Sequence, residues 1–234
     1  MPANGTAMLI SLVDILRVES IESLEHEEEY LIGQYPDLAG SLTSRAENGH
    51  LQSVLQRLHR KEKPDLVVMG TTGASGIKKI FFGTNTAAVL RWVAGPILAI
   101  PHGVKFTGID RITLALPRQA QQAFKYPDFL AELISNYAAR LALINVNEES
   151  QYEYPEENEL DNSSVSDGKM TIQKYNIYKN KPVEGILLFL EQHPSDMLVM
   201  LARQYNILKK LFHHSHTREM AMVTQVPLLV LHDS

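Results

Sequence analysis

The sequence predicts an α/β fold made of two tandem copies of an open, mostly parallel, five-stranded type of sheet flanked by helices. The main observation is an internal repeat: residues 65–100 align without gaps on residues 196–231, at an offset of 131 residues. Each copy runs from a short apolar segment through a helical segment to a proline and a second apolar segment. This pattern is typical of a β-α-β unit with two buried parallel strands.

The first copy is expected to contain the following elements, in chain order. The apolar run at 7–14 predicts a strand, and "LTSRA" (42–46) is a second candidate strand. Residues 53–65 predict a helix that ends before its proline, because the residue before proline disfavours the helical conformation. Apolar residues then predict strands in 65–70 and 95–100, with a helical segment between them.

The second copy has the same elements and two more at its start. "RITLALP" (111–117) predicts a strand, and residues 128–142 predict a helix with apolar side chains on one face. The expected strands at 140–147 and 170–175 and the helix at 185–196 follow. Because the first copy has no counterpart of the leading strand and helix, we expect it to lack both. The true start of the protein is then expected upstream of Met1, the alternative being that the first copy is completed in another way.

Length and charge narrow the class of protein. The 234 residues suffice for two small domains, predicted at 1–103 and 108–234 with the glycine-rich "HGVKFTG" (102–108) as their connection. The net charge of -5, without a basic surface, argues against nucleic acid as a partner. The chain has no cysteine, which excludes disulfides and cysteine metal sites. The apolar run at 7–16 is too short to span a membrane, so we expect a soluble, cytoplasmic protein.

Acidic side chains follow the early strand of each copy. Glu25 and Glu27 to Glu29 form the first group, and a longer group extends from Glu148 to Glu159. Such charge runs usually form the solvated face of a helix or a loop, and we interpret them so.

A glycine-rich stretch, "MGTTGASGIKKIFFGT" (69–84), joins the first repeated strand to its helix. At the carboxyl end of a parallel strand, such a turn presents unpaired backbone N–H groups and the positive end of a helix dipole to an anion. Gly70, Gly73 and Gly76 would let a phosphate approach the backbone, and Gly83 with Thr84 would offer a second contact. The spacing is neither that of the lysine-containing P-loop nor that of the dinucleotide fingerprint. A plain turn and a phosphate site are both compatible with the glycines alone.

The segment "VVMGTTGASGIKKIFFGTNTAAVL", followed by "GPILAIP", resembles the universal stress protein family. ATP-binding members of that family carry Gly-x-x-Gly, nine residues, then Gly-Ser/Thr in this context. The resemblance implies an adenine nucleotide alpha hydrolase-like sheet with strand order 3-2-1-4-5. It also implies ATP or another adenine nucleotide, with Mg²⁺ possible beside it, at the switch point between strands one and four.

The resemblance further implies the residues of this nucleotide site. Family members place an aspartate after their first strand, and the first copy has no equivalent residue because that strand is missing from it. The remaining implied residues are Ile15 against the adenine, Met69 and Gly70 along the ribose and phosphates, Gly73 below the phosphates, and Gly83, Thr84 and Asn85 on the outer oxygens.

The second copy has lost these glycines. Their positions hold Leu201, Gln204, Ile207 and His214, whose side chains would fill the space of a phosphate, so we expect no ATP site of the family type in this half. Two histidines, His213 and His216, are spaced one helical turn apart, as in some zinc sites. No third ligand accompanies them, and we expect no metal site.

The sequence therefore predicts a non-catalytic, nucleotide-binding stress-response module without catalytic residues and with at most slow ATP hydrolysis. The alternative is a dimeric interaction or scaffold protein of the same fold that does not need nucleotide. A third hypothesis is a hydrolase or nucleotidyl-transfer enzyme of the related α/β superfamily. The apolar last strands, "GPILAI" and "VPLLVL", are expected to pair with each other or across a homodimer.

Overall fold

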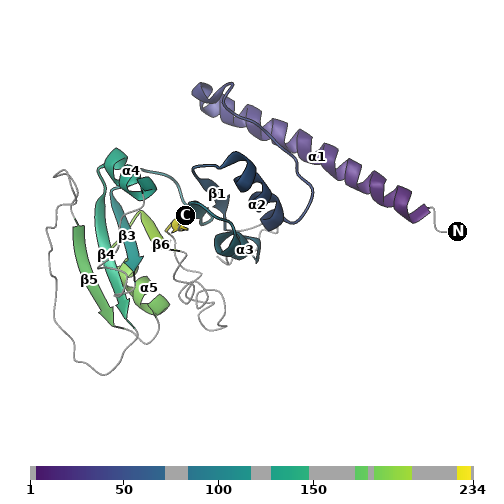
Figure 1. Ribbon diagram of the computed structural model, residues 1–234. Coiled ribbons are helices and arrows are strands. Elements are labelled where there is room, and N and C mark those ends of the chain that lie inside the picture. Colours follow the sequence, from purple (N-terminus) through teal and green to yellow (C-terminus); the bar gives the residue numbers. More distant parts are fainter. Residues whose placement is uncertain are drawn as a thin grey trace. The chain divides into compact units, whose positions relative to one another are not determined.

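The computed structural model describes most of the chain as helices, strands and their connections (Figure 1). Its residues form two compact units, 1–54 and 55–234. The division into domains at 103–108 stays a prediction. The described residues are 4–71, 84–116, 128–147, 172–178, 182–201 and 226–232.

The first unit consists mainly of one helix, α1 (Asn4–Gln34), followed by a short 3-10 helix, η1 (Pro36–Leu38). The strand expected at 7–14 is wrong, because these residues form the first part of α1. A short apolar run has no periodicity that separates strand from helix. Here it continues without proline into a segment rich in leucine and glutamate, which favour helix. The acidic residues of 25–29 lie on α1, as expected of a solvated helix.

The second candidate strand of the first unit is also wrong. Residues 42–48 are irregular, although the Ser44 hydroxyl donates a hydrogen bond to the Glu28 carboxylate of α1. A strand needs a paired neighbour for its backbone groups, and residues 4–54 contain no strand. None of the helices in the described ranges has the length and apolar character required to cross a membrane.

The second unit contains a seven-stranded sheet with the order β1-β2-β7-β6-β3-β4-β5. All neighbouring strands run parallel except β2 and β7, which are antiparallel. The mostly parallel α/β fold predicted from the sequence is confirmed. The strands are β1 (Val67–Gly70), β2 (Ile97–Ile100), β3 (Arg111–Leu116), β4 (Arg140–Asn147), β5 (Ile172–Tyr178), β6 (Met197–Leu201) and β7 (Leu228–Leu231).

Helices cover both faces of this sheet (Figure 1). One core cluster contains Val89 of α3 and Phe189 of α5, and the other contains Leu130 of α4. Neighbouring strand residues alternate between the clusters, as Leu114 and Ala115 of β3 do, because successive side chains of a strand point to opposite faces. The helices are α2 (Leu51–Glu62), α3 (Thr84–Trp92), α4 (Asp128–Tyr137) and α5 (Pro182–Gln192).

The repeat is visible in the hydrogen bonds that begin the paired strands. The Val67 N–H donates to the Pro96 carbonyl at 3.0 Å, and the Leu198 N–H donates to the Pro227 carbonyl at 2.9 Å. Both residues of the second bond lie 131 positions after those of the first. Within the second half, the strands lie side by side in the order β5-β4-β3-β6-β7. If the five strands of this half are numbered 1 to 5 along the chain, this order is 3-2-1-4-5.

The two halves of the sheet meet where β2 pairs with β7. Ile97 lies opposite Val230, Leu98 opposite Leu229, and Ala99 opposite Leu228. The sequence left open whether these last strands pair within the chain or between two chains. In the structure they pair within the chain, which makes one continuous sheet from both halves.

We predict that replacing Leu229 by alanine lowers the free energy of unfolding by about 2–5 kcal/mol, because the side chain is buried and its removal leaves a cavity. Leu229 is 1% exposed and belongs to the core cluster covered by α4. Urea unfolding would measure the loss. The matched control is Leu188→Ala on α5, where the leucine is 41% exposed and the expected loss is below about 1 kcal/mol. Equal losses in the two variants would contradict the core position of Leu229.

Candidate functional site

The predicted nucleotide site begins at the carboxyl end of β1. Met69 is half-buried and packs against the core cluster that contains α3, whereas Gly70 at the strand end is exposed. The ladder continues one residue beyond the strand, because the Thr71 N–H donates to the Ile100 carbonyl at 3.0 Å. The backbone is therefore fixed by β2 up to the point where the glycine-rich stretch leaves the sheet.

The first turn of α3 lies beside this strand end. The Thr86 hydroxyl, on a side chain that is 3% exposed, donates to the Gly70 carbonyl at 3.3 Å. Thr84 and Asn85 belong to the same turn, and the Asn85 side chain is exposed. The structure thus brings Gly70 together with the start of α3, where unpaired backbone N–H groups and the helix dipole favour an anion.

Thr71 is a further polar residue at this point, which the sequence reading did not assign. Its side chain is 2% exposed, and its hydroxyl has no hydrogen-bond partner among the described residues. A buried hydroxyl without a partner costs free energy that a ligand oxygen can recover by accepting its hydrogen. A phosphate or ribose oxygen has this chemistry. The available signal in the sequence was the first threonine of "GTTG", directly after the strand.

The other predicted site residues are Ile15, Gly73 and Gly83. Ile15 lies on α1 in the first unit, where its side chain is 51% exposed, so its expected position at the end of a strand is wrong. Its predicted contact with adenine depended on that strand. Gly73 and Gly83 lie outside the described residues, as do Gln204 and His214 of the second copy, and the two histidines considered for zinc.

The second half shows what replaces glycine at the same strand end. Leu201 lies opposite Leu231 in the ladder, as Gly70 lies opposite Ile100, so the two positions are equivalent. The Leu201 side chain is half-buried and packs against the core cluster covered by α4. A leucine at this position is consistent with the expectation that this half does not take a phosphate there, although that expectation remains a prediction.

Two histidines contact the backbone near the end of α3 and just before β2. His232, just after β7, places Nδ1 at 2.8 Å from the Gly95 carbonyl and Nε2 at 3.1 Å from the Leu90 carbonyl. His59 of α2 packs so close to Gly95 that a Cβ on this glycine, which has φ +84°, would meet the His59 Cε1 at 2.7 Å. These contacts fix the end of α3 against β2 and β7. The sequence gave no sign of them, because the partners are distant in the chain.

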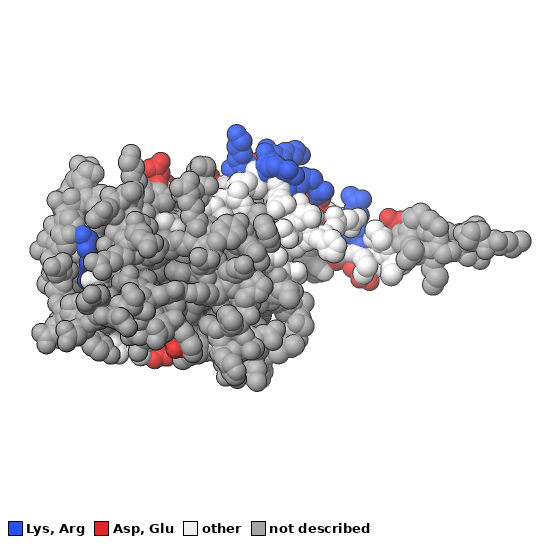
Figure 2. Space-filling view, turned by 60° about the horizontal axis from the view of Figure 1, so that its bottom comes forward, with Lys and Arg blue, Asp and Glu red and all other residues white. Residues whose placement is uncertain are grey.

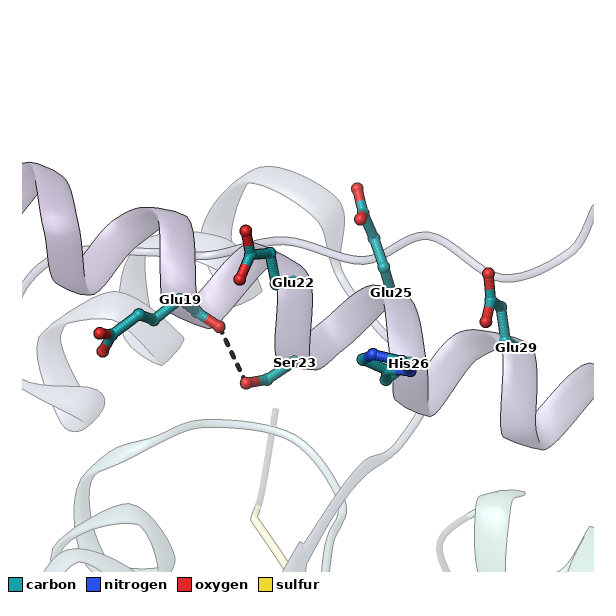
Figure 3. Close-up of a pocket in the computed structure, with 6 residues that line it drawn as sticks. All are labelled: Glu19, Glu22, Ser23, Glu25, His26 and Glu29. Carbon is teal, nitrogen blue, oxygen red and sulfur yellow. Dashed lines mark hydrogen bonds between the residues drawn. The ribbon is translucent and has the colours of Figure 1, made fainter.

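The acidic face of α1 is a different candidate. Six residues line a pocket of about 530 Å³ there, shown in Figure 3. Their carboxylates are spread along the helix rather than aimed at one point, and the Ser23 hydroxyl is engaged with the Glu19 carbonyl at 2.8 Å. Within the described ranges, no group of three His, Asp or Glu residues is arranged to hold a metal ion. The six residues are Glu19, Glu22, Ser23, Glu25, His26 and Glu29.

Basic side chains gather elsewhere on the described surface. Figure 2 shows Lys and Arg side chains concentrated in one band of that view, whereas acidic side chains are scattered. Two basic residues, Arg60 and Lys61, lie in the last turn of α2, where positive charge stabilises the carboxyl end of a helix. This end of α2 leads into the start of β1, at the opposite end of the strand from Gly70. We therefore do not count these residues as phosphate ligands.

Comparison with known proteins relates part of this chain to a protein family. Residues 14–101 match the sequence model of the universal stress protein family. The matched segment includes β1, the glycine-rich stretch, α3 and β2. No curated protein matches the chain in sequence. The match covers less than half of the chain, so it describes this segment rather than the whole protein.

Solved structures of universal stress proteins share the fold. One from Archaeoglobus fulgidus DSM 4304 is 17% identical and has a TM-score of 0.59, covering 92% of this chain and 79% of its own. A putative universal stress protein from Pseudomonas aeruginosa UCBPP-PA14 is 14% identical with a TM-score of 0.53, covering 89% of this chain and 78% of its own. At these identities the likeness concerns the fold. The relation to the universal stress protein family rests on the sequence match at residues 14–101.

We predict that Thr86→Val lowers the free energy of unfolding by about 1 kcal/mol, because it leaves the Gly70 carbonyl without the hydroxyl donor. Thr86→Ser keeps the hydroxyl and serves as the control, with a smaller loss. Urea unfolding of both variants would measure the difference. If Thr86→Val is as stable as the serine variant, the hydrogen bond does not hold α3 beside β1.

Proposed function

We propose that this protein is a non-catalytic adenine nucleotide-binding module of the universal stress protein type. The observation that carries the proposal is the buried Thr71 hydroxyl, which has no hydrogen-bond partner among the described residues and lies at a strand end that also meets the start of a helix. A nucleotide phosphate would accept a hydrogen bond from this hydroxyl and lie near the positive end of α3. Mg²⁺ bound with the nucleotide would supply charge neutralisation of the phosphates.

Each residue at the strand end has a distinct part in this proposal. Gly70 has no side chain, so its exposed backbone can come close to the ribose and phosphates. Asn85 is exposed in the first turn of α3 and can donate from its side-chain amide to an outer phosphate oxygen. Met69, Gly73, Gly83 and Thr84 are further contacts that the family resemblance implies.

The described polar side chains at this strand end argue for binding rather than catalysis. They are Thr71, Asn85 and Thr86, and none of these is an effective general base at neutral pH. Thr86 is already engaged with the Gly70 carbonyl. Nucleotide binding would then stabilise the folded state and the connection between β1 and α3. A surface through which the protein contacts other proteins would be held in one conformation as a result.

One observation favours the alternative, a nucleotide-independent interaction protein. The first half of α1 carries five large apolar side chains that are between 46% and 55% exposed. Groups of exposed apolar side chains commonly mark protein interaction sites. They are Leu12, Val13, Ile15, Leu16 and Val18.

We predict that ATP raises the melting temperature of the wild-type protein and that Thr71→Val reduces this increase. Loss of one hydrogen bond to a charged phosphate should weaken ATP binding about 10- to 100-fold. The variant without ATP should melt at the same or a higher temperature, because it removes a buried hydroxyl for which the described residues provide no hydrogen-bond partner. Thermal unfolding with and without ATP, combined with direct titration, would measure both effects.

The control is Thr107→Val, at an exposed position in the connection after β2, which should leave ATP binding unchanged. An equal ATP effect in wild type and Thr71→Val would remove Thr71 from the site. Absence of any ATP or AMP effect on the wild type would favour the nucleotide-independent alternative. Release of ADP well above the background rate would instead favour an enzyme.

A further inference from the structure

The antiparallel pairing of β2 with β7 brings the end of the second copy against the first copy. Ile97 at the start of β2 lies opposite Val230 near the end of β7. The residue after β7, His232, therefore lies beside the residues that precede β2, among them Gly95. A side chain of the second copy thus contacts the backbone of the first.

Both ring nitrogens of His232 face backbone carbonyl oxygens. Nδ1 lies 2.8 Å from the Gly95 oxygen, and Nε2 lies 3.1 Å from the Leu90 oxygen. A carbonyl oxygen can only accept a hydrogen bond, and a neutral imidazole has one N–H and one nitrogen lone pair. The neutral ring can therefore make either hydrogen bond but not both. The imidazolium ring has an N–H on each nitrogen and can make both.

The position of Leu90 gives a second reason for the protonated ring to be favoured. Leu90 lies in the last turn of α3, which ends at Trp92. The last carbonyl groups of a helix have no intrahelical partner and lie at the negative end of the helix dipole. A protonated His232 would donate to one of these carbonyls and place its positive charge at the end of the helix.

The surroundings of His232 contain few other titratable groups. β2, β7 and the connection at 93–96 have no charged or titratable residue. α2 contributes His59, which packs against Gly95 and whose buried Nδ1 has no hydrogen-bond partner among the described residues. Protonation of His59 would leave an N–H at this nitrogen without an acceptor there. The side chains of Arg91 on α3 and Asp233 after His232 lie outside the described residues.

The contact is not a feature of the repeat. The residue 131 positions before His232 is Pro101, whose side chain has no hydrogen-bond donor. The two hydrogen-bond acceptors of His232 both belong to the first copy, at 90 and 95. His232 is therefore a contact of the junction between the copies.

We propose that His232 makes the coupling between the two copies sensitive to pH. In the protonated form, its ring ties the end of β7 both to the Gly95 carbonyl and to the last turn of α3. Loss of the proton removes one of these hydrogen bonds and the positive charge at the helix end, so the β2–β7 junction becomes weaker.

The sign of the effect follows from the unfolded chain, which has neither hydrogen bond. Folding therefore favours proton uptake by this ring, and the added stability is present at acidic pH and is lost as the ring loses its proton. The charge of a histidine changes between about pH 5 and 8, so the junction responds within the physiological range.

The test compares the wild type with His232→Gln, because a glutamine amide can donate a hydrogen bond but cannot gain a proton. Urea unfolding of each protein at about pH 5.5 and about pH 8.5 gives the two unfolding equilibrium constants on either side of the histidine titration. The ratio of the variant's constant to that of the wild type should be about tenfold larger at the acidic pH, since one hydrogen bond from a charged donor is lost. The ratio cancels the pH dependence of the groups that both proteins share.

The matched control is His102→Gln, which removes an exposed histidine in the connection after β2. Its ratio to the wild type should be the same at both pH values. A change equal to that of His232→Gln would show that the pH effect does not come from the junction.

A second measurement uses the wild type alone and does not depend on the folding of a variant. Nitrogen NMR of the histidine rings, with His232 identified by its contacts to Leu90 and Gly95, reports the protonated fraction directly. This fraction should be larger in the folded chain than in the same chain unfolded in urea at the same pH.

The proposal is overturned if the His232→Gln ratio is the same at both pH values or is larger at the alkaline pH. If His232→Gln does not fold, an equal or smaller protonated fraction of His232 in the folded chain overturns it. Neither measurement contains ATP, so failure of nucleotide binding would not affect them.

Discussion

The antiparallel pairing of β2 with β7 is the contact on which the rest of the structure depends. β1 and β2 alone are two four-residue strands, which are too few and too short for independent stability in water. By pairing with β7, they become one end of a seven-stranded sheet and share a core cluster with α5 and β6. His232 strengthens the same junction, because its two ring nitrogens lie against carbonyls at the end of α3 and before β2. The first copy is therefore stabilised by the second.

This dependence explains the geometry at the end of β1. β2 holds the backbone up to Thr71, and the Thr86 hydroxyl connects Gly70 to the start of α3. Gly70 and the Thr71 hydroxyl, which has no partner in the described part of the chain, then lie close to the first turn of α3. In the second half the same scaffold carries Leu201, whose side chain joins the core. At this repeated backbone position, glycine leaves the strand end exposed, whereas leucine packs into the core.

Comparison of the two copies also shows a difference between β6, which follows Asp196, and β1, which follows Asp65. Asp196 is engaged with the start of β3, and β6 is buried between two neighbours. Asp65 and Val68 have the equivalent positions but remain exposed. Because the backbone ladder on the other side of each strand is the same, the exposure goes with β1 having no second strand neighbour among the described residues rather than with a different strand conformation.

The sequence by itself determined the strands and helices of the second unit, since apolar runs bounded by proline and an amphipathic helix are local signals. The strands expected at 140–147 and 111–117 are found with nearly the same bounds, and the helix expected at 128–142 begins at residue 128 but ends at Tyr137. The repeat also predicted the equivalence of Gly70 and Leu201. Only the tertiary structure decided that residues 7–14 are helical, because a short apolar run fits either element until its neighbours are known. It also decided the burial of Thr71 and the hydrogen bonds of Asp196 and His232, which depend on residues distant in the chain that local patterns do not encode.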